Sequence, residues 1–122
     1  MTAALATVAD EKSTFAISAA FTDENGAPVT PTALNWTLTD LVGNVINSRA
    51  GVVVTTPAST VTIVLSGADL ALDGLGDRLR RLTLKGTYNS SLGSGLPFVN
   101  AAQFLLERDP TTKVVTVLNG GV

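Results

Sequence analysis

The chain repeatedly alternates apolar and polar side chains with a period of two, and this pattern is the strongest constraint on its fold. In residues 14–21, alternate positions are occupied by Phe15, Ile17, Ala19 and Phe21. Because successive side chains of a strand point to opposite faces, this segment predicts a strand with one buried face. The same alternation predicts further strands at residues 34–39, 60–66, 81–88 and 98–107.

Short segments rich in Gly, Pro, Asn and Asp separate the predicted strands. Asn25-Gly26 is typical of a tight turn, since both residues tolerate a positive φ angle. We predict that residues 45–49 form the hairpin partner of 34–39, and that 67–72 form one helical turn crossing between sheets. Weaker strand patterns lie at residues 51–56 and 114–118. Strands at such short spacing favour an antiparallel sandwich or barrel.

Length and composition indicate one globular domain. The chain has 122 residues, 45% of them hydrophobic and 15% charged, which excludes a disordered tail. We predict an N-terminal arm at 1–12, the β-domain at 13–109, and a C-terminal arm or edge strand at 110–122. The first ten residues lack a basic start and a long apolar run, so we expect no signal peptide. No apolar stretch approaches the ~18 residues of a membrane span.

Charge and missing residue types limit the chemistry. The formal net charge is −2, whereas nucleic-acid binders normally carry a basic excess, so we expect no direct nucleic-acid binding. The chain contains no Cys, which excludes a thiolate nucleophile, a disulfide and a Cys-based metal site. It also contains no His, the commonest general base and transition-metal ligand. We therefore expect no catalytic residue, no cofactor and no metal.

Two aromatic residues make the pattern more specific. Trp36 lies in an early predicted strand and Tyr88 in a late one, and Ala68-Asp69-Leu70 lies on a short crossing between them. This arrangement resembles immunoglobulin-like and fibronectin type III-like domains, in which a core Trp lies on the third strand and a Tyr marks the penultimate one. The resemblance covers about residues 13–109. It implies an immunoglobulin-like antiparallel β-sandwich, although the inter-sheet disulfide of antibody domains is absent.

The first half of the chain carries a second resemblance. The segments 15–21, 23–26, 28–31 and 34–40, followed by Gly43, are similar to small immunoglobulin-like proteins encoded among tailed-phage virion genes. That likeness implies a non-enzymatic virion structural protein, placed on the capsid as a decoration or at the head–tail neck. It also implies assembly in the host cytoplasm as a homo-oligomer or symmetric array. The implied partners are capsid, portal or tail subunits, with no membrane contact.

A carbohydrate- or surface-binding module is the alternative function. It predicts exposed aromatic side chains, for which only Phe98 and Tyr88 are candidates. Trp36 shares its strand face with Leu34 and Leu38, which favours a place in the core.

One basic cluster, formed by Arg78, Arg80, Arg81 and Lys85, is the candidate partner-binding surface. On a strand, Arg81 and Lys85 share the outer face. They either dock onto an acidic partner surface or form an ordinary solvated face, with Asp77 as a counter-charge.

The acidic and serine-rich segments have ordinary interpretations. Asp23, Glu24 and Asn25, with Asp40 and Asn44, offer oxygen ligands for Ca²⁺, but their spacing favours turn capping. Asp69, Asp73 and Asp77 recur every four residues, yet Gly74 and Gly76 argue against the helix that would align them for glycoside hydrolysis. Ser90, Ser91 and Ser94 lack a His partner, which favours a flexible loop over a nucleophile.

Overall fold

The computed structural model describes residues 2–5, 8–72 and 78–107. Within these ranges almost all regular structure is β-strand, so the chain is an all-β protein, as the alternation predicts. The elements are β1 (Thr2–Ala4), β2 (Ala9–Asp10), β3 (Thr14–Ala20), β4 (Ala33–Thr39), β5 (Val52–Val53), β6 (Thr60–Ser66), the 3-10 turn η1 (Gly67–Leu70), β7 (Leu79–Ser90) and β8 (Gly93–Glu107).

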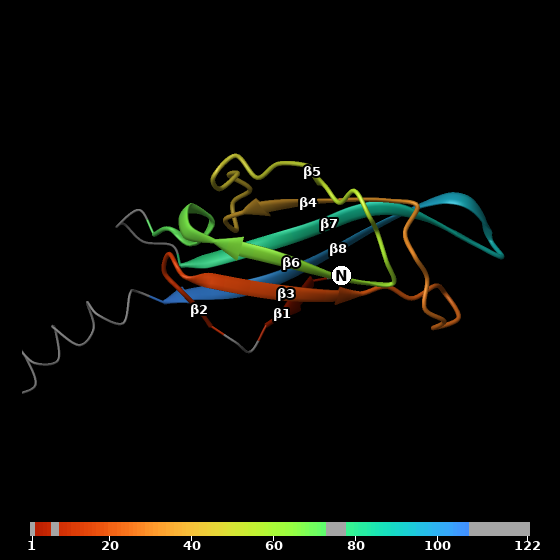
Figure 1. Ribbon diagram of the computed structural model, residues 1–122, viewed down its shortest axis with the longest axis horizontal. Helices are drawn as coiled ribbons and strands as arrows, with labels where there is room; N and C mark the ends of the chain where they lie inside the picture. Colours follow the sequence, from red (N-terminus) through yellow and green to blue (C-terminus); the bar gives the residue numbers. More distant parts are fainter. Residues whose placement is uncertain (1, 6–7, 73–77, 108–122) are drawn as a thin grey trace, which may run out of the picture.

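The strands form one large sheet and one small sheet (Figure 1). The large sheet has the order β1-β8-β7-β4-β5, and β2 also pairs with β8. The small sheet consists of β3 and β6. Strands β7 and β8 form a long hairpin in which Leu79 lies opposite Leu105 and Tyr88 lies opposite Leu96. The turn of this hairpin projects at one end of the molecule (Figure 1).

The core lies between the apolar faces of the two sheets. Phe15 of the small sheet meets Phe104 of the large sheet, with ring centroids 5.0 Å apart. Trp36 is buried, as its strand pattern predicts. The alternation therefore identifies the inward face of each main strand correctly. The buried apolar residues are Ala9, Phe15, Ile17, Phe21, Leu34, Trp36, Leu38, Ile63, Leu65, Leu70, Leu82, Leu84, Phe104 and Leu106.

The N-terminal segment differs from the predicted arm. Residues 2–4 and 9–10 pair in parallel with β8, and Ala9 is buried in the core. Backbone groups carry this pairing: the N–H of Leu5 donates to the Gln103 carbonyl at 2.9 Å. Because small, weakly patterned side chains give no alternation signal, the sequence does not reveal such a ladder. The large sheet is consequently mixed, and the expectation of a purely antiparallel fold is wrong for these two strands.

The hairpin partner of β4 also differs from the prediction. Residues 45–49 do not form a regular strand, since Asn47 and Ser48 have positive φ angles of 52° and 57°. Its backbone meets β4 through a bridge between Val45 and Thr39 and through hydrogen bonds with Leu38. The strand that pairs with β4 is β5, farther along the chain. The predicted single helical turn forms as η1, while the C-terminal arm at 110–122 and its strand at 114–118 lie outside the described residues.

Candidate functional site

Strand β7 divides the predicted basic cluster between two faces. Arg78 is exposed just before the strand, Arg81 is half-buried and Lys85 is exposed. Arg81 and Lys85 lie on the outer face of the large sheet, one on each side of Thr83 along the strand. Their place on one outer face agrees with the sequence, and their contact with a partner stays a prediction.

Arg80 does not belong to that surface, and its assignment to the partner-binding cluster is wrong. It shares the inner face with Leu82 and Leu84, and it is only 3% exposed. Its guanidinium donates to the carbonyl oxygens of Leu79 at 3.0 Å and Ala71 at 3.4 Å. Strand alternation places neighbouring arginines on opposite faces, so Arg80 is a structural residue at the end of the core.

The acidic turns use their carboxylates to cap the backbone. Asp23 Oδ1 accepts from the N–H groups of Asn25 at 2.9 Å and Ala27 at 3.0 Å. Asp40 Oδ1 accepts from three successive N–H groups, those of residues 42–44, at 2.9 Å. Hydrogen bonds from the Asn44 side chain and from this backbone lower the pKa of Asp40. Among the described residues, no group of three or more Asp or Glu side chains is placed to hold a metal ion.

Asp69 belongs to a buried polar cluster that the sequence did not reveal. It is 1% exposed, and its Oδ1 accepts from Arg49 Nε and from Asn47 Nδ2, both at 2.8 Å. Its Oδ2 accepts from the Ser66 N–H at 3.1 Å. Burial alone would raise the pKa of Asp69, but these hydrogen bonds outweigh it and lower the pKa. Asp69 therefore holds the loop after β4 against the turn after β6. Asp73 and Asp77, which recur with Asp69 every four residues in the sequence, lie outside the described residues.

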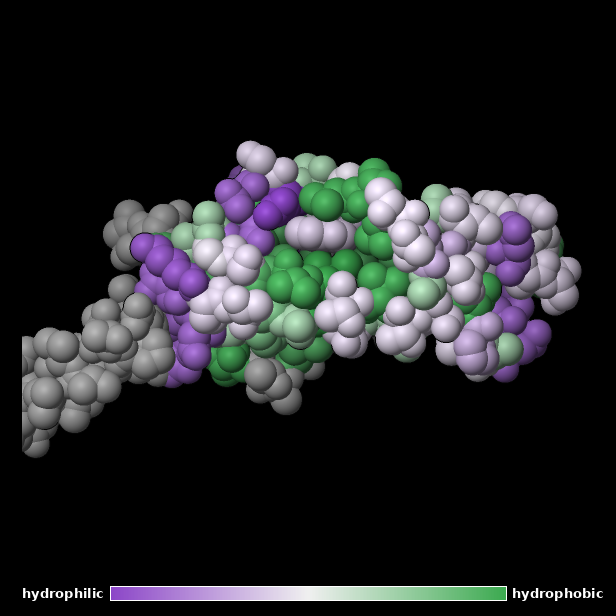
Figure 2. Space-filling model, viewed as in Figure 1, coloured by the Kyte–Doolittle hydropathy of each residue, from purple (hydrophilic) through white to green (hydrophobic). Residues whose placement is uncertain are grey.

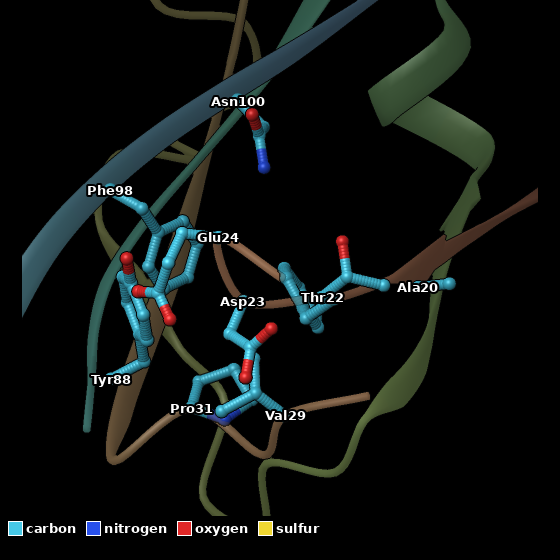
Figure 3. Close-up of a pocket in the computed structure, with 10 residues that line it drawn as sticks. Ala20, Thr22, Asp23, Glu24, Val29, Pro31, Tyr88, Phe98 and Asn100 are labelled. Carbon is cyan, nitrogen blue, oxygen red and sulfur yellow. The ribbon is translucent and has the colours of Figure 1, made fainter. Parts of the chain in front are cut away.

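A pocket of about 330 Å³ opens at the end of the molecule where β3 meets the hairpin of β7 and β8. Tyr88 and Phe98 form one wall, with ring centroids 6.2 Å apart, and the turn after β3 brings Asp23 and Glu24 toward them (Figure 3). Among the residues that the structure describes, no basic side chain lines this pocket. We call it the acidic pocket; its lining residues are Ala20, Phe21, Thr22, Asp23, Glu24, Val29, Pro31, Tyr88, Phe98 and Asn100.

The walls of the acidic pocket have a local structural cause. Gly86 lies opposite Phe98 in the β7–β8 ladder, and the Phe98 ring covers the space where a side chain would stand. Phe98 also meets Phe21 across the pocket, with centroids 5.4 Å apart. On the acidic side, Glu24 Oε1 accepts from the Ser90 hydroxyl at 2.8 Å. That bond places Ser90 in a structural contact.

A second, more apolar pocket of about 170 Å³ adjoins the first along β3. Five consecutive residues, 17–21, line one side, and Asn100 to Ala102 of β8 line the other. Leu5, Leu82 and Leu84 complete the lining. Both pockets share Ala20, Phe21 and Asn100, so they lie next to each other between β3 and β8. We call the two adjacent pockets together the seam.

The outer face of the small sheet carries no charge. Its side chains are Thr14, Ala16, Ser18, Ala20, Thr60, Thr62, Val64 and Ser66. On the face shown in Figure 2, apolar and weakly polar residues cover the middle, while strongly hydrophilic residues lie toward the two ends. An uncharged strand pair presents no electrostatic barrier to another protein chain.

Sequence reasoning found the individual residues of the seam but not their convergence. The sequence offers Phe98 and Tyr88 as candidate exposed aromatics, and Asp23 and Glu24 as turn-capping residues or Ca²⁺ ligands. No alternation or motif links residues so far apart in the chain. Comparison with known proteins adds nothing to this assignment: no family model, curated protein or solved structure matches the chain. Within the described residues, no helix is long and apolar enough to span a membrane.

Proposed function

We propose that the domain is an immunoglobulin-like sandwich. Two observations of strand order and the position of one buried residue support this. Strands β4, β7 and β8 are neighbours in one sheet, as are the third, sixth and seventh strands of such domains. Strands β3 and β6 pair in the other sheet, as the second and fifth do. Trp36 lies buried on β4, the position that matches the core Trp.

We further propose that the protein is a non-enzymatic structural subunit that binds neighbouring subunits, in a tailed-phage virion. The seam is the observation that carries this proposal, because an apolar pocket there lies beside an edge of β3 with which no described strand pairs. Such edges bind extended protein segments by strand addition. The virion setting comes from the sequence resemblance. Capsid decoration and the head–tail neck are both compatible with it.

The titratable groups of the acidic pocket favour binding over catalysis. Its carboxylates, Asp23 and Glu24, already accept hydrogen bonds from the backbone and from Ser90. The chain offers no His or Cys to act as a base or nucleophile. We therefore propose that the pocket holds a side chain or ligand without transforming it.

Sedimentation with virions tests the proposed function. Purified chain, alone and mixed with virions from its source, is centrifuged under conditions that pellet only large particles. We expect the chain to pellet with the virions and to stay in solution alone. A chain that ignores virions at saturating concentration contradicts the proposal.

A glycan-binding module is the second candidate, because two aromatic rings face two carboxylates in the acidic pocket. Aromatic rings and planar polar groups are what sugar sites require. This alternative predicts binding on a glycan array that Tyr88→Ala abolishes. Glycan binding without virion binding would replace the structural role.

A further inference from the structure

The edge of β3 that faces the seam has free backbone groups. The Phe21 N–H donates to the Ser59 carbonyl. Because hydrogen-bonded pairs alternate along an antiparallel ladder, the odd-numbered residues of β3 direct their backbone N–H and C=O groups toward β6. The N–H and C=O groups of Ala16, Ser18 and Ala20 therefore point to the opposite edge. In the part of the chain that the structure describes, no strand pairs with β3 at this edge.

The seam is chemically divided along its length. Its half beside Ile17 and Ala19 is apolar, and its half beyond Phe21 is the acidic pocket. An extended segment lying antiparallel to β3 would meet the acidic pocket first and the apolar pocket next. Such a segment fits the seam if it begins with a cationic side chain and carries apolar side chains two and four residues later.

The chain itself contains a segment with this pattern. Lys113, Val115 and Val117 occupy alternate positions near the C-terminus, in a stretch rich in β-branched residues. From Lys113 to Val117 the spacing equals that from Phe21 back to Ile17. Placing Lys113 opposite Phe21 therefore puts Val117 opposite Ile17, with all three side chains directed into the seam.

We propose that residues 113–118 of a second copy of this chain add to β3 as an antiparallel strand. Val114, Thr116 and Leu118 of that copy would exchange backbone hydrogen bonds with Ala20, Ser18 and Ala16. Lys113 would enter the acidic pocket, against the Tyr88 and Phe98 rings and the Glu24 carboxylate. Val115 and Val117 fill the apolar pocket.

Chain length excludes the same molecule as donor. Strand β8 runs away from the acidic pocket, and Phe98 and Glu107 are separated by nine residues, about 30 Å of extended chain. Lys113 follows Glu107 by six residues, which span at most about 22 Å. A molecule therefore cannot place its own Lys113 in its own acidic pocket, whereas a neighbour can.

The contact is head-to-tail, because the seam of one copy receives the C-terminal segment of the next. Such heterologous contacts generate rings when the rotation closes and open arrays when it does not. This inference rests on the proposed function and names a second copy as one of the neighbouring subunits.

Self-association of the full chain provides the first test. We expect the weight-average mass of the wild type to rise with concentration in analytical ultracentrifugation. Ala20→Pro removes an edge N–H that bonds to none of the residues the structure describes, and Lys113→Glu reverses the incoming charge. Each should raise the Kd by at least about tenfold. The matched controls, Ala20→Val and a charge reversal at the exposed Asp10 outside the seam, Asp10→Lys, should associate like the wild type. Circular dichroism checks that every variant folds.

Mixing the two blocked variants tests the direction of the contact. Ala20→Pro retains a normal donor segment, and Lys113→Glu retains a normal seam. Together they should form a one-to-one complex that grows no further. Larger assemblies, or no complex, contradict the head-to-tail geometry.

A peptide spanning residues 111–119 gives a test that does not depend on self-association. We expect it to bind the Lys113→Glu chain, and to bind far more weakly to Ala20→Pro. A peptide that does not bind overturns the inference. Virion binding without peptide binding would leave the proposed function intact, and peptide binding without virion binding would reject the virion setting alone.

Discussion

Arg49 Nε lies 2.8 Å from Oδ1 of Asp69, and this ion pair joins two loops at one end of the core. Asp69 is 1% exposed, whereas the Arg49 side chain is 43% exposed. The Arg49 guanidinium also lies over the Trp36 ring, 6.0 Å from its centroid. Arg49 therefore contacts both the buried Asp69 and Trp36, the core Trp on which the immunoglobulin-like resemblance depends.

Asp69→Asn should lower the free energy of unfolding by about 1–3 kcal/mol at neutral pH, because buried donors lose their charged acceptor. Urea unfolding measures the change. Asp10→Asn, at an exposed carboxylate of β2, is the control and should shift stability by less than about 0.5 kcal/mol. Equal effects of the two substitutions would show that the ion pair contributes nothing.

Acidification should destabilise the wild type through the same carboxylate. The pKa of Asp69 is lowered in the folded state. Its ionised carboxylate therefore makes its full contribution to the free energy of unfolding above the unfolded pKa of about 3.9. That contribution is lost as the pH falls through the lowered folded value. Unfolding curves between pH 7 and 2 should therefore show a smaller acid-induced loss of stability in Asp69→Asn than in the wild type. An identical pH dependence contradicts the lowered pKa.

Phe104→Ala should cost about 3–5 kcal/mol, because the ring is fully buried against Phe15 between the sheets. Val99→Ala on the same strand is the control, since Val99 is 55% exposed. We expect that change to stay within about 0.5 kcal/mol. Thermal unfolding of both variants measures the difference. Wild-type stability of Phe104→Ala would contradict the packing of this ring between the two sheets.

Gly86→Ala should destabilise the domain by about 3 kcal/mol. An added Cβ would overlap the Ala33 carbonyl oxygen and press on the Phe98 ring at 2.9 Å. Lys85→Ala, one residue earlier and exposed, is the matched control. Because Phe98 forms a wall of the acidic pocket, the variant should also change the fluorescence of Tyr88. Wild-type stability in Gly86→Ala would contradict the close strand approach.

Charge reversal should separate the two kinds of basic residue on β7. Arg81→Glu and Lys85→Glu should leave unfolding nearly unchanged and weaken virion binding, because both side chains lie on the outer face. Arg80→Ala should lower stability, since that residue is buried. Sedimentation with virions, paired with urea unfolding, resolves the two effects. Normal virion binding in both Glu variants would remove this face from the contact.

The sequence alone determined the strands whose side chains face the core. Alternation located β3, β4, β6, β7 and β8, since each buries one face and exposes the other. It also placed Trp36 in the core and Arg81 with Lys85 on one outer face. These features depend on the spacing of neighbouring residues, which the sequence displays directly.

Only the tertiary structure decided the pairing of strands and the contents of the seam. Strands β1 and β2 join β8 through backbone groups, which carry no sequence signal. The acidic pocket unites Glu24 with Phe98, and the buried Asp69 meets Arg49, across distances in the chain that no periodicity spans. Periodicity fixes which way a side chain points, but the packing of the sheets fixes what it meets.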